Sequence, residues 1–187
     1  ETGFVVHPRL APQLAKRTQM LDEGTVDWSA GEMFAFGSLL LEGHPIRLAG
    51  QDVRRGTFSN RHACVVDQNT GKDWFPLQGL IGSDNQFFVF DSLLSEYAAM
   101  GFEYGYSVER DNHSSARIER YLALCAEENM TVAQPSTPAS YFHLLRWHMK
   151  NPARRPLVVI EPKSMLRLKA AASGLNDFTN GNFQRVI

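Results

Sequence analysis

Residues 85–107, NQFFVFDSLLSEYAAMGFEYGYS, lead from an apolar aromatic run into a run of small and apolar residues. The first part, NQFFVFDS, is short and rich in phenylalanine, which is typical of a strand covered on both faces. The second part, from Ser95 to Ser107, has the length and composition of a helix. Because a strand that leads directly into a helix is the repeating unit of α/β folds, this stretch sets the fold class.

The same alternation extends in both directions from this stretch. Further strands are expected in PIRLAG (45–50), in HACVVDQNTGKDWFPL (62–77, two strands around the turn QNTG), in MTVAQPS (130–136) and in RPLVVIEP (155–162). Helices are expected in QLAKRTQMLDEG (13–24), WSAGEMFAFGSLLLE (28–42), SARIERYLALCAEEN (115–129), ASYFHLLRWHMK (139–150) and, as a short helix or turn, KSMLRLKAAAS (163–173). The pattern predicts a three-layer α/β sandwich with a mostly parallel sheet.

Local signals mark the ends of two of these helices. Asp27 is a suitable N-cap for the helix over 28–42, and Gly43 is suited to end it. The pair Thr-Pro at 137–138 supplies an N-cap and a first helical residue for the next long helix. Gly31 and Gly37 lower the intrinsic propensity of the first helix, and we expect them to permit close approach of another backbone in a buried setting.

The overall composition bounds the class of protein. Of the 187 residues, 43% are hydrophobic and 21% are charged, which is typical of a globular domain in water. The net charge of −1 gives no electrostatic case for a nucleic acid or a membrane as partner, and no run reaches the ~20 apolar residues of a membrane span. No signal peptide is visible, so the expected location is cytoplasmic.

The two cysteines, Cys64 and Cys125, lie outside any spacing typical of a zinc site or a disulfide framework. Both are expected to be small buried hydrophobic residues in a reducing cytosol. The histidines His44, His143 and His148 show no ligand spacing either, so no metal site is predicted.

Polar residues follow four of the expected strands. They lie in LAGQD (48–52), FDSLLSE (90–96), AQPST (133–137) and EPKS (161–164). In open α/β sheets, ligands bind outside the carboxyl ends of the strands. These four segments are therefore the candidate site, although the pattern by itself names no chemistry.

Four long segments of the sequence carry a resemblance to a known family. They are RLAGQDVRRGTFSNRHACVVD, DSLLSEYAAMGFEYGYSVE, HSSARIERYLALCAEENMTVAQPSTPASYFHLLRWHMK and RPLVVIEPKSMLRLKAA. Taken in order, they resemble the pyrimidine-binding, transketolase-like domain of the thiamine component of 2-oxoglutarate dehydrogenase, above all in bacterial enzymes that also work as 2-oxoglutarate decarboxylases. The resemblance covers most of residues 27–172.

The resemblance implies a division of the chain and a set of partners. Residues 27–172 are expected to form the pyrimidine-binding domain, 1–26 a lead-in or linker, and 173–187 the start of a linker to a C-terminal domain. The cofactor would be thiamine diphosphate, with its Mg²⁺ and diphosphate held by a domain that this sequence does not contain. Expected partners are that diphosphate-binding domain, a lipoyl-bearing acyltransferase component and a second copy in a homodimer.

The segment near 108–113 is shorter than in the family. Relatives have further sheet strands, a helix and an aromatic residue that packs on the aminopyrimidine between the equivalents of FEYGYS and HSSARIER, where this sequence has only VERDN. The sequence leaves open whether the connection is truly shortened. A chain of this kind is expected to be inactive by itself.

Glu96 and Leu94 are the expected cofactor contacts. On pattern alone, Glu96 is an acid in a helical first turn, where the helix dipole favours it by ~0.3–1 kcal/mol. The resemblance matches it to the family glutamate that hydrogen-bonds N1′ of thiamine diphosphate, which makes Glu96 catalytic as well as cofactor-binding. Leu94 would supply part of the apolar setting that raises the pKa of such a carboxyl group.

Three other residues are expected near the substrate. His113 matches a family histidine that binds substrate and intermediates, and is assigned a catalytic role as well. Gln51 would face the reactive end of the cofactor and the substrate. His62 is expected either to line the site or to begin a strand with its ring hydrogen-bonded.

Two interpretations remain at this stage. The first is the pyrimidine-binding part of a 2-oxoglutarate dehydrogenase or decarboxylase, which performs oxidative decarboxylation in the tricarboxylic acid cycle and acyl transfer to a lipoyl carrier. The second is a non-catalytic interaction module that kept the fold after losing an internal segment. The neighbouring charges Asp52, Arg54 and Arg55 fit loop order or subunit contacts as well as they fit substrate binding.

Overall fold

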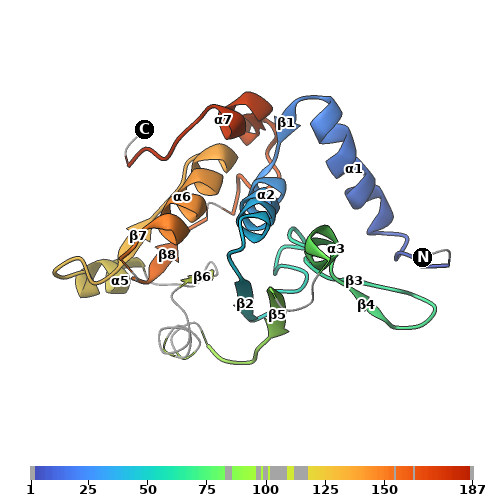
Figure 1. The fold of residues 1–187 in the computed structure, drawn as a ribbon, viewed down its shortest axis with the longest axis horizontal. Coiled ribbons are helices and arrows are strands. Elements are labelled where there is room, and N and C mark those ends of the chain that lie inside the picture. Colours follow the sequence, from blue (N-terminus) through green and yellow to red (C-terminus); the bar gives the residue numbers. More distant parts are fainter. Residues whose placement is uncertain are drawn as a thin grey trace.

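The computed structural model describes residues 3–82, 86–95, 98, 101, 109–111, 118–153, 155–161 and 163–185. Helices and short strands alternate along most of this chain (Figure 1). The helices are α1 (Ala11–Asp22), α2 (Trp28–Leu41), α3 (Pro76–Ile81), α5 (Ile118–Leu124), α6 (Pro138–Lys150), α7 (Leu175–Thr179) and the 3₁₀ turn η1 (Lys169–Ala171). The strands are β1 (Thr25–Val26), β2 (Ile46–Gly50), β3 (Val65–Val66), β4 (Asp73–Trp74), β5 (Phe87–Asp91), β6 (Glu109–Asp111), β7 (Thr131–Ala133), β8 (Leu157–Val159) and β9 (Ser173–Gly174). Among these described helices, none is long and apolar enough to cross a lipid bilayer.

Parallel pairing dominates the central strands. β2 pairs with β5, with Ile46 opposite Phe87 and Gly50 opposite Asp91. β8 lies between β6 and β7 in a three-stranded parallel group. Two antiparallel pairs, β1 with β9 and β3 with β4, lie outside these groups. The parallel α/β character predicted from the sequence is therefore present, in small sheets.

Helices α2 and α6 pack side by side against the strands (Figure 1). The Asp27 carboxylate caps α2 by accepting a hydrogen bond from Ala30 N at 2.9 Å, and Gly43 ends the segment with a φ of +85°. A Cβ at Gly31 would lie 3.1 Å from the carbonyl oxygen of Pro138, so the predicted close approach occurs here. Glycine is required because any side chain would press on the first turn of α6.

The core lies between these two helices and the strands. Its largest fully buried side chains come from α2, β5, α6 and β8 and include Trp28, Leu39, Phe87, Leu144 and Leu157. Residues from all four elements thus share one apolar cluster. Burial of such side chains contributes about 1.5–3 kcal/mol each, which makes this cluster the main source of stability.

Strands from the first and last parts of the chain, β1 and β9, pair beside this core. Val26 in β1 pairs with Ser173 in β9, and Ser173 Oγ accepts a hydrogen bond from Ala139 N at 3.1 Å. Further along, Phe178 is buried against Phe142, with ring centroids 5.3 Å apart. The segment after residue 172 therefore packs directly on α6, and β1 is joined to it through β9.

Three sequence expectations about the second half are wrong. The helix expected over 115–129 ends at Leu124, because Glu127 and Glu128 have left-handed backbones with φ of 50° and 59°. Cys125, expected to be buried, lies just beyond this helix end and is exposed, whereas Cys64 is buried as expected. The i, i+3, i+4, i+7 spacing of Ile118, Tyr121, Leu122 and Cys125 predicts one apolar helix face. Leu122 is nevertheless 55% exposed, whereas Tyr121 is buried.

Candidate active site at the strand ends

The parallel pair β2 and β5 places two predicted site residues together. Ser92 N donates to Gly50 O at 2.7 Å, so the pairing continues one residue past the end of β5. One residue beyond β2, Gln51 Nε2 donates to the carbonyl oxygen of Leu94 at 3.3 Å. The structure thus brings Gln51 and Leu94 into contact at the carboxyl ends of the strands, where the α/β rule expects a ligand.

Two of the other predicted site residues, Glu96 and His113, lie outside the described residues. Glu96 follows Leu94 by two positions in the sequence. Their roles stay predictions, as do those of Gln51, Leu94 and His62.

A loop of unusual backbone geometry, residues 51–62, runs from Gln51 to His62. Asp52, Ser59 and His62 all have left-handed φ values, of 55°, 52° and 49°, which L-residues rarely adopt. At Gly56, with φ +82°, a Cβ would come within 2.3 Å of Asn60 Oδ1. Loops with several such positions keep their conformation only when the surroundings hold them.

Hydrogen bonds within the loop and to β5 support this shape. Gly56 N donates to Asp52 O at 2.7 Å, and His62 N donates to Arg55 O at 2.9 Å. Arg54 N donates to the Asp91 carboxylate at 3.1 Å, which ties the loop to the end of β5. The loop therefore shares one anchor with the strand that carries Leu94.

His62 is buried beneath this loop, with 8% of its surface exposed. Its Nε2 lies 3.1 Å from Ser59 O, which assigns the proton to Nε2 in the neutral ring because a carbonyl can only accept. Burial lowers the pKa of His62, and the positive charge of Arg17 lowers it further. The ring is thus hydrogen-bonded within its own loop, which was one of the two arrangements expected for it.

The loop arginines are paired with neighbouring acids. Arg55 forms an ion pair with Asp52, and Arg54 forms one with Asp73 and also donates to Cys64 Sγ at 3.0 Å. Burial raises the pKa of Cys64, against the opposing effect of Arg54. These pairings match the interpretation of the charges as loop order.

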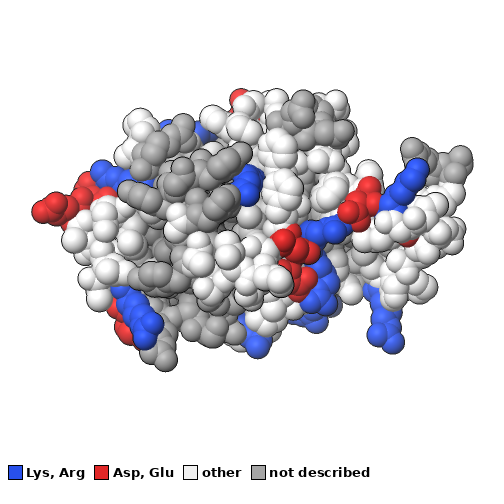
Figure 2. Space-filling model, turned by 90° about the horizontal axis from the view of Figure 1, so that it is seen from below, with Lys and Arg blue, Asp and Glu red and all other residues white. Residues whose placement is uncertain are grey.

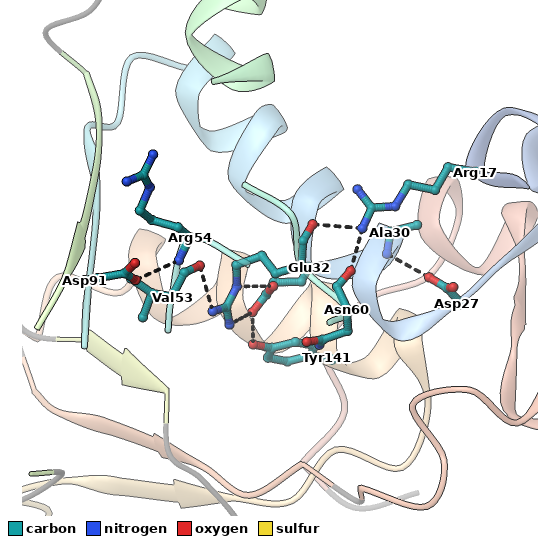
Figure 3. Close-up of polar contacts among 10 residues, drawn as sticks. Arg17, Asp27, Ala30, Glu32, Val53, Arg54, Asn60, Asp91 and Tyr141 are labelled. Atoms are coloured by element: carbon teal, nitrogen blue, oxygen red, sulfur yellow. Dashed lines mark hydrogen bonds and ion pairs between the residues drawn. The ribbon is translucent and has the colours of Figure 1, made fainter. Parts of the chain in front are cut away.

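Sequence reasoning missed a buried polar network beneath the loop (Figure 3). Arg61 binds the Glu32 carboxylate with both Nε and Nη2, at 2.7 and 2.8 Å, and both side chains are 4% exposed. Tyr141 OH donates to Glu32 Oε1 at 3.0 Å, and Arg61 Nη1 donates to Val53 O at 3.4 Å. One signal was available, since Glu32 is an isolated acid in the apolar run of α2 and an acid in such a position needs a partner.

Two further arginines hold the outer side of the loop. Arg17, from α1, donates through Nη2 to Asn60 O at 2.5 Å and to Arg61 O at 2.8 Å. Burial lowers the pKa of Arg17, partly offset by the acids Asp27 and Glu32. Arg167, from the segment that follows β8, donates to Phe58 O. The loop is thus contacted from α1, α2 and the segment beyond β8, while Tyr141 of α6 binds the Glu32 carboxylate.

Potential metal-ligating side chains are dispersed among the described residues. Within the described residues, no group of three or more histidine, cysteine or acidic side chains is arranged to hold a metal ion. On the face seen in Figure 2, acidic and basic side chains lie interspersed among uncharged residues. Several of these charges are neutralised locally, as where Glu42 pairs with Arg146 and Lys150.

Comparison of the sequence with those of known proteins identifies a family. The sequence profile of the family described as "Transketolase, pyrimidine binding domain" matches residues 24–112 and 111–169. The chain belongs to this family. It is also 43% identical to the "Multifunctional 2-oxoglutarate metabolism enzyme" of Mycobacterium sp. (strain JLS), over 99% of this chain and 19% of that protein. It is 45% identical to the "2-oxoglutarate dehydrogenase E1/E2 component" of Corynebacterium glutamicum, over 99% of this chain and 20% of that protein.

The chain spans about a fifth of the length of the curated relatives it matches. The alignment with the Mycobacterium protein runs over 243 positions, whereas this chain has 187 residues, so at least 56 aligned positions have no counterpart here. The two matched segments of the family profile meet at residues 111 and 112. This transketolase-type pyrimidine-binding domain therefore differs from its relatives by internal length.

Proposed function

We propose that this chain is the pyrimidine-binding part of a thiamine diphosphate-dependent 2-oxoglutarate dehydrogenase or decarboxylase. The observation that carries the proposal is the 43–45% identity to proteins named for 2-oxoglutarate, over 99% of the chain. The assembled enzyme would decarboxylate 2-oxoglutarate oxidatively and transfer the acyl group to a lipoyl carrier, as in the tricarboxylic acid cycle. Its partners would be a diphosphate-binding domain, a lipoyl-bearing acyltransferase component and a second copy of the chain, in the cytoplasm.

The strand ends fit the pyrimidine half of the cofactor. A heteroaromatic ring needs an apolar surface beside polar groups, and Leu94, 43% exposed, lies beside the amide of Gln51. Leu94 and Glu96 would hold the ring, with the Glu96 carboxyl group sharing a proton with N1′. When bound, thiamine diphosphate supplies the nucleophilic carbon and the electron sink for decarboxylation. The Mg²⁺ would be held by another domain.

Gln51 and His113 are the proposed direct substrate contacts, and His62 is proposed to support the substrate site indirectly. The Gln51 amide offers a donor at the strand ends, where the 2-oxo group or a carboxylate would be placed. His113 would donate a hydrogen bond to charge that develops on the substrate oxygen, and would act as a catalytic residue. His62 would act through the shape of loop 51–62, because its ring is engaged with Ser59 O.

We also infer a truly shortened connection near residues 108–113. The meeting of the two profile segments at 111–112 and the excess of aligned positions in relatives support it. In this arrangement β6 pairs with β8 and lies next to β2, so the two parallel groups would complete one sheet in a three-layer sandwich. The shortening also favours the second candidate function, an interaction module that has kept the fold without the chemistry.

The test combines this chain with the diphosphate-binding part of the Corynebacterium glutamicum enzyme, expressed separately. The assay measures CO₂ released from 2-oxoglutarate with thiamine diphosphate and Mg²⁺ present. We expect no turnover by the chain alone, and turnover in the mixture once the relative's intervening segment is inserted between residues 111 and 112. Glu96→Ala should abolish this turnover, while Glu128→Ala, at an exposed ion pair with Arg155, should leave it unchanged.

Each alternative result has a distinct meaning. Appreciable decarboxylation by the 187-residue chain alone would contradict its proposed dependence on another domain. Full turnover in the Glu96→Ala mixture would remove the assigned role of Glu96. A stable complex of the two parts that shows no turnover, with or without the inserted segment, would favour the interaction module.

A further inference from the structure

The loop over residues 51–62 is held in a conformation that its own sequence does not favour. Asp52, Ser59 and His62 have left-handed backbones, and each such residue raises the energy of the loop relative to extended or helical alternatives. The loop nevertheless ends on Gln51 and His62, the two predicted substrate-side residues that the structure describes. Some contact outside the loop must therefore stabilise this geometry.

The contact with the most complete burial is the network of Glu32, Arg61 and Tyr141 (Figure 3). Glu32 comes from the middle of α2, Tyr141 from α6, and Arg61 from the end of the loop. Since the helices form the packed core of the domain, Glu32 and Tyr141 are fixed relative to the strands. Arg61 is the only member of this trio that belongs to the loop, and its bidentate geometry with Glu32 allows little rotation of the guanidinium.

A stabilising role alone does not explain this arrangement. The free energy needed to remove two charges from water offsets much of the electrostatic attraction between them. A buried ion pair can therefore often be replaced by apolar side chains without loss of stability. Apolar contacts are not directional, so apolar side chains in these positions would not fix the orientation of the Arg61 side chain. A bidentate pair together with a tyrosine hydroxyl defines one position and orientation for the Arg61 side chain, and hence for the backbone on either side of it.

We propose that Glu32, Arg61 and Tyr141 form a positioning unit that holds loop 51–62 in its strained conformation and so places Gln51 at the strand ends beside Leu94. The three act through the loop and are positioning residues. The link from loop geometry to catalysis rests on the proposed function above, whereas the link from the network to loop geometry does not.

The first measurement is amide hydrogen exchange in a triple variant, Glu32→Leu, Arg61→Leu and Tyr141→Phe. These changes keep the site filled with apolar side chains of similar size. We expect exchange at the loop amides of Gly56 and His62 to become at least about tenfold faster, because these hydrogen bonds would then open locally. Exchange at Gly71 N, bonded to Asp67 O in the turn between β3 and β4, should stay as in the wild type and serves as the internal control.

Two further variants keep the test decisive if the triple variant fails to fold. Tyr141→Phe alone keeps the ion pair and should leave loop exchange close to wild type. Arg61→Lys keeps the charge but replaces the bidentate contact by a single one, and should give intermediate exchange. Glu128→Gln, which removes an exposed ion pair with Arg155, is the matched control and should change nothing in the loop.

The outcomes separate this proposal from the proposed function. Faster exchange confined to the loop, together with reduced turnover of the two-part assembly described above, supports positioning. Unchanged loop exchange, or acceleration spread equally to the Gly71 turn, overturns it. Loop release with wild-type turnover would overturn the role of the network in placing Gln51. If the wild-type assembly has no turnover, the proposed function fails, and loop exchange alone still decides whether the network holds the loop.

Discussion

The buried pair of Glu32 and Arg61 allows a quantitative prediction about stability. Replacing Arg61 by Leu removes two hydrogen bonds, of 2.7 and 2.8 Å, from a carboxylate whose side chain is 4% exposed. An uncompensated buried charge of this kind typically lowers the free energy of unfolding by about 3–5 kcal/mol. Glu32→Leu should cost a similar amount, because it leaves the guanidinium without its carboxylate.

Removing both charges together should restore most of this loss. The double variant Glu32→Leu, Arg61→Leu takes the carboxylate acceptor from the Tyr141 hydroxyl, and loss of such a buried hydrogen bond costs about 1–3 kcal/mol. Adding Tyr141→Phe removes that hydroxyl as well. The triple variant should therefore unfold with a free energy within about 1 kcal/mol of the wild type, although each single charge variant is severely destabilised.

Urea unfolding measures these differences. Far-ultraviolet circular dichroism reports the helices. Fluorescence in a Trp74→Phe, Trp147→Phe background reports the core near Tyr141 through Trp28, since their ring centroids lie 6.0 Å apart. Coincident transitions by the two probes, and the same dependence of the unfolding free energy on urea, would show that all variants unfold in two states. Their midpoints can then be compared directly. The exposed pair of Arg155 and Glu128 is the control, and its removal should cost less than about 1 kcal/mol. Single charge variants that lose less than this control, or a triple variant as unstable as the singles, would refute the reasoning.

Two further predictions concern glycine packing and pH. Gly31→Ala should lower the free energy of unfolding by about 1 kcal/mol, because a Cβ 3.1 Å from Pro138 O overpacks the contact between α2 and α6 by more than alanine gains in helix propensity. Gly79→Ala, where a Cβ meets nothing within 4 Å, should instead raise the free energy of unfolding by about 0.5–1 kcal/mol. Equal effects of the two changes on the urea midpoint would contradict the close contact of α2 and α6. Because burial and the charge of Arg17 hold the pKa of His62 below the usual range for histidine, the unfolded state binds the proton more readily. Stability should therefore fall as pH is lowered through about 6.5. His62→Asn, which tolerates the left-handed backbone, should reduce this fall between pH 7.5 and 5.5 in urea titrations, and an unchanged pH dependence would mean that the ring is not buried in solution.

Local sequence signals predicted the long helices well. Asp27 caps α2, and Thr137 caps α6 in a capping box with Ser140. These interactions join residues three positions apart, so their geometry depends on the backbone of a single turn and hardly on the rest of the fold. The strands β2, β5, β7 and β8 likewise follow from short apolar runs bounded by polar residues. The contact of Gln51 and Leu94 at the strand ends follows from the same runs through the general rule for parallel sheets.

Hydrophobic spacing alone gave a wrong prediction for α5, because it does not show where the helix ends. Periodicity placed Leu122 and Cys125 on one apolar face, yet the helix ends at Leu124 and both residues are exposed. A helical period describes a face only while the helix continues. The left-handed residues Glu127 and Glu128 show that it does not continue here.

The sequence by itself determined the α/β class, the helix caps, the strand ends and the family to which the motifs point. Each of these depends on residues that lie close together in the chain. Only the tertiary structure decided which charges matter beneath the loop. Glu32 and Arg61 lie 29 positions apart, and Glu32 and Tyr141 lie 109 apart, so no local pattern joins them. Their pairing arises because α2 packs on α6 across Gly31 and excludes water, and a buried carboxylate is then stabilised by whichever cation and hydroxyl the fold brings to it.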